Sequence, residues 1–382
     1  MSPVHHDVGR APELLEVRDA YRIPELIIER ARELAGCAVA LYVVDLDGSF
    51  LLHLAGEGVQ LEKRVAAPLA VGPELAPEAI GAVQELIGHL APETTVVPLI
   101  VRDRALGVLV CEREPTSSLD AFAADAAMSL ELAAGYSDVV HSARRHKETK
   151  PAAEIQQGLL PPRLATLPGY TLAGGVLPGY EIGGDFFDYA ANADGLWVAI
   201  GDAVGKGTAA AALAAIGLGA YRAARRSGST LLETLATMDE AIASVGDFAY
   251  LTAILAICDA DRNIQWITCG HPPPLRVGTD GTVVELTDGH TWPLGLWPSE
   301  RKATVAQTRL ARGEQLVLYS DGVTDRKLHN GGRLTLAGIE DALKARPRPS
   351  AAATVRALHS AVIEAATAPL DDDATVLAIA SA

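Results

Sequence analysis

The sequence predicts an α+β protein with two folded parts, and three observations lead to this fold class. Apolar runs of strand length are paired around short polar turns, as in Val39–Val44 and Phe50–Leu54, which is typical of antiparallel hairpins. Longer runs such as Leu196–Ala203 and Gln315–Ser320 are apolar on both faces, so we expect them in sheets that are covered on both sides. The length of 382 residues is enough for two or three domains.

Residues 11–143 are predicted to form the first domain. Their order of helix, hairpin, helix, hairpin, helix predicts an antiparallel sheet with helices packed against it. The expected elements are a helix at Ile23–Leu34, a hairpin of Val39–Val44 and Phe50–Leu54 around Asp45–Gly48, a hairpin of Val96–Val101 and Leu106–Cys111 around Arg102–Arg104, and a long helix from Leu119.

A connecting helix is expected over Leu119–His146, where apolar residues recur at a loose three-four spacing. Two interpretations remain open: a short parallel dimer coil, or the last helix of the first domain packing on its own sheet. Residues 144–165 are predicted to be a helical connector. Within it, Thr149 is a candidate N-cap, Pro151 suits the first helical turn, and Pro161–Pro162 ends the helix.

Residues 166–382 are predicted to be the second domain, in which strands and helices alternate. A hairpin over Ile254–Thr268, turning at Asp261–Asn263, indicates antiparallel pairing. The expected strands are Leu196–Ala203, Tyr250–Asp259, Asn263–Thr268, Gln315–Ser320 and Ala374–Ala380, and the expected helices are Thr208–Arg225, Thr230–Ser244 and Ala351–Thr367.

Composition excludes several classes of protein. The net charge of -16 argues against a nucleic acid or an anionic membrane as a partner, because either would need a basic face. The start Met1–Arg10 is polar, unlike a signal peptide, and the longest apolar stretch, Ala209–Tyr221, is too short to cross a bilayer, so a cytoplasmic location is predicted. No CxxC pair is present, and four cysteines are interpreted as small core residues: Cys37, Cys111, Cys258 and Cys269.

Short acidic clusters, far apart in the chain, are the strongest indication of function. They are Gly183-Gly184-Asp185, Gly201-Asp202 with the following Gly-rich turn, Ser320-Asp321-Gly322 and Asp371-Asp372-Asp373. Three of them adjoin an apolar strand, and a carboxylate at a strand end beside glycine is a common way to build a metal site. If these strand ends converge, they form an all-oxygen site suited to Mg²⁺ or Mn²⁺.

The same clusters carry a family resemblance. The order GGDFFD, GDAVGKG, CGHPPPL, PLG, YSDGVTD and DDDAT, over Glu154–Ala382, resembles the PPM-type (type 2C-like) metal-dependent protein phosphatases, and most of all their bacterial SpoIIE-type branch. The resemblance implies an α-β-β-α sandwich with a metal cleft at one end. In the first domain, PLIVRDRALGVLVCE followed by the helix Phe122–Ala134 resembles GAF sensor domains, which implies a regulatory role.

The resemblance also implies roles for individual residues. Asp185, Asp202, Asp321 and Asp372 would be the catalytic metal ligands, joined by the carbonyl oxygen of Ala203. Asp202 would bridge two Mn²⁺ or Mg²⁺ ions, with Asp185 on the second-metal side and Asp321 on the first. Taken alone, Asp202 is better explained as a turn aspartate that accepts backbone N–H bonds, and Asp185 also has that explanation. The run Asp371–Asp373 alone could be a solvated loop, although the strand that follows at once argues against it.

Three neighbouring residues invite other interpretations. Asp188 competes with Asp185 as a ligand of the GGDFFD motif. His271 is either a general acid or the anchor of a rigid, proline-rich loop, and we favour the anchor. Lys206 is not a P-loop lysine, because the preceding glycine spacing is one residue short and Gly207 stands where Ser or Thr is required.

The predicted function is that of a metal-dependent phosphatase. Two cations about 3.5–4 Å apart would activate a water that hydrolyses phosphoserine or phosphothreonine. The SpoIIE-type resemblance implies a phosphorylated anti-anti-sigma (STAS-domain) protein as substrate, a small-molecule or protein signal at the GAF-like domain, and a homodimer. The alternative is a non-catalytic scaffold that binds a partner without turnover.

Overall fold

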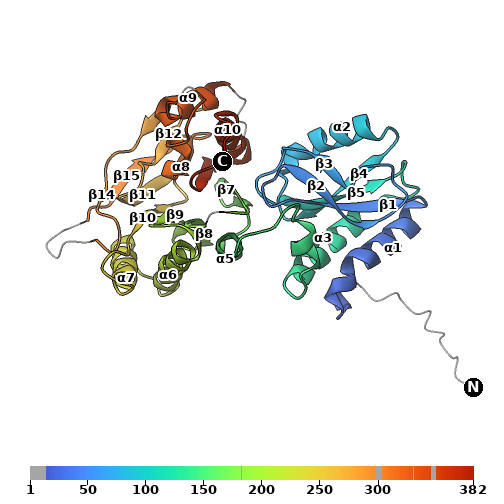
Figure 1. Cartoon of the computed structure of the whole chain (residues 1–382), viewed down its shortest axis with the longest axis horizontal. Coiled ribbons are helices and arrows are strands. Elements are labelled where there is room, and N and C mark those ends of the chain that lie inside the picture. Colours follow the sequence, from blue (N-terminus) through green and yellow to red (C-terminus); the bar gives the residue numbers. More distant parts are fainter. Residues whose placement is uncertain (1–13, 182, 297–302, 330, 346–349) are drawn as a thin grey trace, which may run out of the picture. The chain divides into compact units, whose positions relative to one another are not determined.

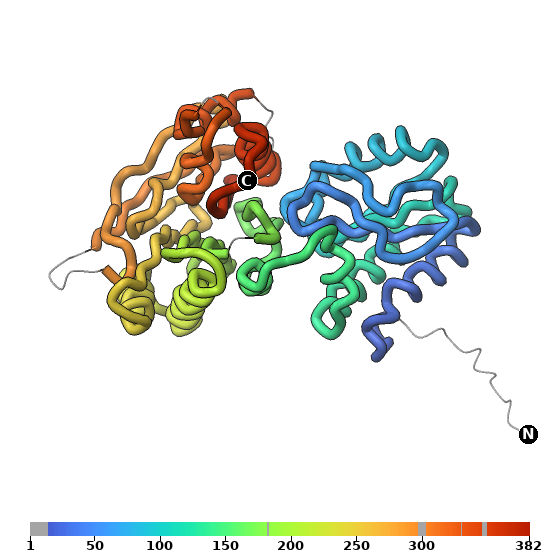
Figure 2. Tube along the Cα trace, viewed as in Figure 1, coloured from blue at the N-terminus to red at the C-terminus, as the bar shows by residue number. Residues whose placement is uncertain are grey.

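The computed structural model describes residues 14–181, 183–296, 303–329, 331–345 and 350–382 (Figure 1). The chain divides into two compact units, one ending at His146 and the other beginning at Lys147. Figure 2 follows the chain through both. No helix in the described ranges has the length and apolar character needed to cross a membrane.

The first unit is an antiparallel five-stranded sheet in the order β3-β2-β1-β5-β4. Its core lies on both faces, under α1 and α3 on one and under α2 on the other. Both predicted hairpins are confirmed. The elements are η1 (Leu14–Glu16), η2 (Ala20–Arg22), α1 (Ile23–Ala35), β1 (Val39–Val44), β2 (Phe50–Gly56), β3 (Arg64–Ala66), η3 (Pro77–Ala79), α2 (Ile80–Leu90), β4 (Thr95–Val101), β5 (Arg104–Cys111), α3 (Asp120–Ala134) and α4 (Val139–Ala143).

The predicted continuous helix over Leu119–His146 is wrong. Helix α3 ends at Ala134, and α4 is a separate short helix in which Val139 N donates to Ser137 Oγ at 3.3 Å. The apolar side of α3, including Leu130, packs in the core of its own unit. The structure therefore matches the second interpretation, a last helix on its own sheet, rather than a coil.

The second unit is an α-β-β-α sandwich, as predicted. One six-stranded sheet has the order β14-β11-β10-β9-β8 with β15 beside β11, and the other has the order β13-β12-β16-β17-β7-β6. All pairs are antiparallel except β11 with β14. A core of side chains from both sheets lies between them, α6 and α7 cover the first sheet, and α10 packs on β7 and β17 of the second.

The bounds of these elements are as follows: α5 (Pro151–Leu159), β6 (Leu164–Leu167), β7 (Tyr170–Leu177), β8 (Asp185–Asn192), β9 (Gly195–Ala203), α6 (Gly207–Arg226), α7 (Leu231–Ala243), β10 (Leu251–Cys258), β11 (Asn263–Cys269), β12 (Leu275–Val277), β13 (Val283–Glu285), β14 (His290–Thr291), β15 (Ala306–Arg309), β16 (Gln315–Tyr319), α8 (Asp321–Thr324), α9 (Thr335–Ala345), α10 (Ala351–Glu364) and β17 (Ala374–Ser381).

Several elements depart from the sequence interpretation, and β7 and the start of α5 are two of them. Strand β7 was not predicted, although it pairs along the whole of β17. Its central Gly174 leaves no room for a side chain, because a Cβ there would lie 2.5 Å from the ring of Phe187, and such glycines weaken a strand pattern. Thr149 does not cap α5: Lys150 occupies the N-cap position, and its side chain makes no capping bond.

Candidate active site

The sheet pairings bring the four acidic clusters to one end of the sandwich. In the first sheet, Asp185 at the start of β8 lies opposite Asp202 near the end of β9. In the second sheet, Asp321 follows β16, and Asp372 precedes its neighbour β17. Thr375 of β17 joins the two sheets, because its Oγ1 donates to Asp185 Oδ2 at 2.5 Å.

Asp373 is the central hydrogen-bond acceptor at the end of the sandwich where the acidic clusters meet. Its Oδ2 accepts bonds from Gly184 N at 2.9 Å, Asp185 N at 3.2 Å and Gln156 Nε2 at 2.7 Å. Its side chain is buried, whereas those of Asp371 and Asp372 are exposed. The sequence interpretation treated Asp373 only as the neighbour of Asp372. The structure makes it the residue that ties β8, α5 and the acidic turn before β17 together.

The glycines of the motifs are explained by close backbone contacts. A Cβ on Gly322 would lie 1.9 Å from the carbonyl oxygen of Asp373, so no other residue fits between Asp321 and the acidic turn. A Cβ on Gly184 would lie 3.1 Å from the carbonyl oxygen of Ala203, and one on Gly183 would lie 2.7 Å from that of Ala152 in α5. These glycines let the acidic segments pack closely.

The carboxylates repel one another, as their pKa values show. Burial, followed by the charges of Asp321 and Asp372, raises the pKa of Asp202 to about 7. Burial and then the charges of Asp202 and Asp373 raise the pKa of Asp185 well above its usual range. Burial and the Asp372 charge likewise raise the pKa of Asp321. Bound cations would remove this repulsion.

The donor set fits hard divalent cations. All the candidate side chains are carboxylates, and Oδ1 of buried Asp373 has no hydrogen-bond partner among the described residues. Across the same ranges, no group of three Asp, Glu, His or Cys side chains lies close enough together to hold a metal ion. Carboxylate oxygens are the ligands that Mg²⁺ and similar hard cations take from proteins.

The competing residues have other roles. Asp188 faces α6, where it accepts bonds from Arg222 at 2.7 Å and Arg225 at 2.8 Å, so it points away from Asp185.

His271 is buried and its Nδ1 lies 2.8 Å from Thr252 Oγ1. Burial lowers the pKa of His271 to about 3. Lys206 Nζ donates to the carbonyl oxygen of Asp371 at 2.6 Å, which is a contact between two loops and not a nucleotide cradle.

Comparison with known proteins agrees with this geometry. The family model of Stage II sporulation protein E (SpoIIE) matches residues 192–381. Residues 192–381 form a SpoIIE-type phosphatase domain. The match contains Asp202, Asp321 and Asp372, whereas Asp185 and Gln156 precede it.

Similar proteins include two curated relatives of the SpoIIE-type domain. The phosphoserine phosphatase RsbU of Bacillus subtilis is 23% identical over 235 residues, which is 61% of this chain and 69% of RsbU. Protein IcfG of Synechocystis is 26% identical over 215 residues, and this chain spans only 33% of its length.

One solved structure supports the fold. The PP2C domain of SiaA from Pseudomonas aeruginosa is 23% identical and superimposes with a TM-score of 0.52, covering 60% of this chain and 94% of that one. The second unit therefore shares the sandwich architecture of that domain. The phosphatase class rests instead on the family match and on the relative RsbU.

Proposed function

We propose that this chain removes phosphate from phosphoserine or phosphothreonine on a signalling protein, in a reaction that depends on divalent metal ions. The convergence of Asp185 and Asp202 from one sheet with Asp321 and Asp372 from the other carries the proposal. The name of the relative RsbU, a phosphoserine phosphatase, supports the choice of substrate group.

The same four carboxylates, with the carbonyl oxygen of Ala203, would hold two Mn²⁺ or Mg²⁺ ions. When bound, such a pair supplies a water of lowered pKa and neutralises phosphate charge. The protein's part is to fix the donors. Asp373 binds the backbone at Gly184 and Asp185, and Gly322 allows the approach of the acidic turn.

The proposed substrate is a phosphorylated anti-anti-sigma protein with a STAS domain. This choice rests on the SpoIIE-type motifs and on the likeness to RsbU. The proposed role of the first unit is that of a GAF-like sensor for a small molecule or a protein. Its antiparallel sheet with helices on both faces supports that role.

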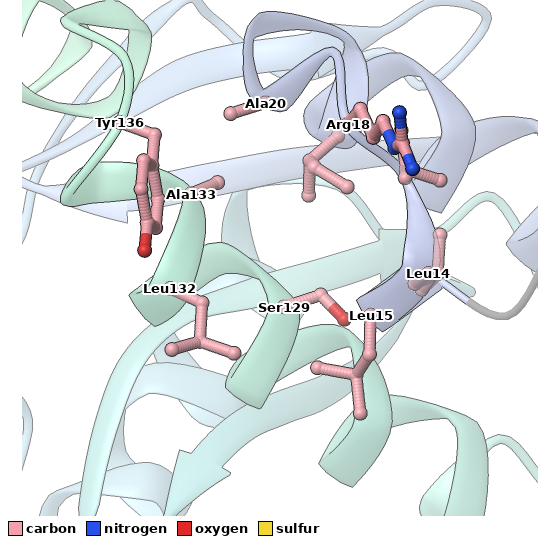
Figure 3. Close-up of a pocket in the computed structure, with 10 residues that line it drawn as sticks. Leu14, Leu15, Arg18, Ala20, Ser129, Leu132, Ala133 and Tyr136 are labelled. Atoms are coloured by element: carbon pink, nitrogen blue, oxygen red, sulfur yellow. The ribbon is translucent and has the colours of Figure 1, made fainter.

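A homodimer is also proposed, through an apolar surface of the first unit. Leu15, Leu132 and Tyr136 are exposed there. They lie around a cavity of about 360 Å³ between the first 3-10 turn and α3 (Figure 3). Exposed apolar patches of this kind often mark protein–protein contacts.

A phosphatase assay tests the proposed function. The full chain is incubated with a phosphorylated STAS protein and with an aryl phosphate, first in chelator and then with Mn²⁺ restored. We expect turnover of both only with the metal. Undiminished turnover in chelator would contradict the metal requirement, and tight binding of the phosphoprotein with no phosphate release at any metal concentration would favour the scaffold instead.

A further inference from the structure

Two of the four thiols are neighbours in the first unit. Cys111, the last residue of β5, lies opposite Val39 of β1, and Cys37 stands two positions before Val39. Cys37 therefore lies in the turn that enters β1, close to the end of β5 that carries Cys111. Both pack against the core under α1 and α3, and their side chains interact directly. Neither is in a disulfide.

The two segments that carry these thiols are already joined by hydrogen bonds. Glu112 N donates to the carbonyl oxygen of Ala38 at 2.9 Å, and Arg113 Nη2 donates to that of Gly36 at 2.8 Å. Cys37 Sγ itself lies 3.7 Å from the carbonyl oxygen of Arg113. A disulfide requires nearby Cα atoms with converging side chains, and the joined segments together with the interaction of the two thiols favour that arrangement.

The two thiols differ in their access to solvent. Cys37 is half-buried in the turn between α1 and β1, whereas Cys111 is fully buried. Burial, followed by the interaction with Cys37, raises the pKa of the Cys111 thiol to about 12. A small oxidant therefore meets Cys37 first, and Cys111 is placed to react with the product.

We propose that Cys37 and Cys111 are a reversible redox pair that closes an intramolecular disulfide when the first unit meets a hydroperoxide. The Cys37 sulfur attacks the peroxide oxygen, the O–O bond breaks, and a sulfenic acid and an alcohol form; with hydrogen peroxide the second product is water. The Cys111 sulfur then attacks the Cys37 sulfur. The S–S bond forms, the S–O bond breaks, and the hydroxyl leaves with the Cys111 proton as water. Two electrons have passed from the thiols to the peroxide, and a thiol reductant reverses the change.

Closure of this disulfide would link two parts of the sensor core. Cys37 follows the end of α1, and the chain after Cys111 runs on into α3. The bond would thus fix the end of α1 to the strand that leads into α3. The inference does not depend on the proposed phosphatase activity.

Thiol counting and peptide mapping of the full chain test the proposal. The native protein is treated with hydrogen peroxide, then denatured, counted for thiols and digested. We expect the four thiols to fall to two, with one linked peptide pair that joins Cys37 to Cys111 and is lighter by two hydrogen atoms. Dithiothreitol should restore all four thiols. Four thiols after peroxide, or a link to any other cysteine, would overturn the proposal.

Variants separate the two roles. In Cys111→Ser, the oxidised Cys37 should persist as a sulfenic acid that dimedone traps, and no linked peptide should form. Cys37→Ser should keep its three remaining thiols. The matched control Cys258→Ala/Cys269→Ala, in the second unit, should still lose two thiols to the linked pair. Equal thiol loss in Cys37→Ser and in the unchanged protein would also overturn the proposal. If a variant fails to fold, the peptide mapping of the unchanged protein still tests the proposal, because it does not use the variants.

Discussion

Three consecutive carboxylates, Asp371 to Asp373, have three different surroundings at the end of the sandwich. Asp371 is exposed and pairs with Lys327 at 2.8 Å, which lowers the pKa of Asp371. Asp373 is buried and binds backbone N–H groups. Asp372 is exposed, and its charge acts on Asp202 and Asp321. The charge of Asp373 also acts on Asp185 and Asp202, but its side chain is held by backbone and Gln156 bonds. Asp372 therefore remains the predicted ligand of the three.

Substitution of Asp372, with its neighbour Asp371 as the control, tests the ligand assignment. Asp372→Asn, like Asp202→Asn and Asp321→Asn, should reduce turnover by at least about 100-fold, beyond what loss of an outer-shell contact costs. The fold should persist, because one repulsive charge is removed. The matched control Asp371→Asn loses only an exposed ion pair and should keep most of its turnover. Equal turnover in the two adjacent variants at saturating metal would refute the assignment.

The raised pKa values of the site carboxylates predict how pH affects stability. Folded Asp202 titrates at about 7 and Asp373, mainly through burial, at about 6, whereas an unfolded Asp titrates at about 3.9. The folded, metal-free state therefore binds more protons in this window, and its free energy of unfolding falls as pH rises through it. His271 and His359 act in the opposite direction below about 6.5, because burial lowers their pKa values to about 3 and about 4.

Melting temperature in chelator checks this pH dependence. As pH falls from about 8 to about 6.5, unfolded histidines also gain protons, so the contribution of Asp202 is measured as the difference between the unchanged protein and Asp202→Asn. Over this range the melting temperature of the second unit should rise in the unchanged protein relative to the variant, and added Mn²⁺ should raise the melting temperature of the unchanged protein most at the higher pH. A difference between the two proteins that does not change with pH in chelator would contradict the raised pKa of Asp202.

His271 is expected to stabilise the fold rather than transfer protons. Its low pKa keeps it neutral in any ordinary assay, and its ring contacts the half-buried hydroxyl of Thr252. His271→Ala should reduce the free energy of unfolding by about 2–4 kcal/mol, because it removes the partner of the Thr252 hydroxyl and leaves a cavity. The melting temperature should fall accordingly. The pH profile of kcat should not change its shape. Loss of an ionisation from that profile, with the melting temperature unchanged, would instead identify a general acid.

At the scale of elements, α5 contributes directly to the candidate site. Gln156 is buried, and its Nε2 donates to the carbonyl oxygen of Asp185 at 2.9 Å as well as to Asp373. The neighbouring Gln157 instead accepts a bond from Arg163 at 2.7 Å. The helix that begins at Pro151 therefore lies within the second unit, against the loop that carries Asp185.

Substitution of the two glutamines measures the contribution of α5. Gln156→Ala should weaken metal binding by about 10–100-fold, as is usual when a group behind a ligand is lost. Its turnover at saturating metal should recover in large part. Gln157→Ala is the matched control and should bind metal as the unchanged protein does. Calorimetric titration with Mn²⁺ provides the measurement, and identical affinities in the two variants would remove α5 from the site.

At the scale of the whole molecule, the connection between sensing and catalysis remains a prediction. Of the two interpretations of Leu119–His146, the dimer coil does not fit the described residues, since α3 packs in its own unit. The surface around Leu132 and Tyr136 is the candidate contact instead. Coupling would require a two-state element that both units bias. Helix α6 is our candidate, because its first turn follows Asp202.

Molecular mass and metal titration test this arrangement. The full chain should be dimeric in solution, and a fragment that starts at Lys147 should be mostly monomeric with a changed metal requirement. Leu132→Glu/Tyr136→Glu should dissociate the full-length dimer, whereas Leu90→Glu, at an exposed apolar residue of α2, should not. Identical mass and identical titration for the full chain and the fragment would leave the first unit without a role in control.

The sequence by itself determined the elements whose signal is local. The hairpin at Asp45–Gly48, the apolar strands before Asp202 and Asp321, and the acidic clusters could all be read from periodicity and turn residues. These features depend on neighbours within a few positions, so pattern alone predicts them. The family motifs then added the sandwich and the identity of the candidate ligands.

Tertiary structure decided the contacts between distant segments. Strand β7 has strand-favouring residues at its ends, but two central glycines interrupt the pattern. Its pairing with β17 and the ring of Phe187 over Gly174 complete it. The distinction between Asp372 and Asp373, the role of Gln156 and the meeting of Cys37 with Cys111 likewise arise from packing. Burial, repulsion and hydrogen bonding across such distances depend on three-dimensional position, which spacing along the chain does not contain.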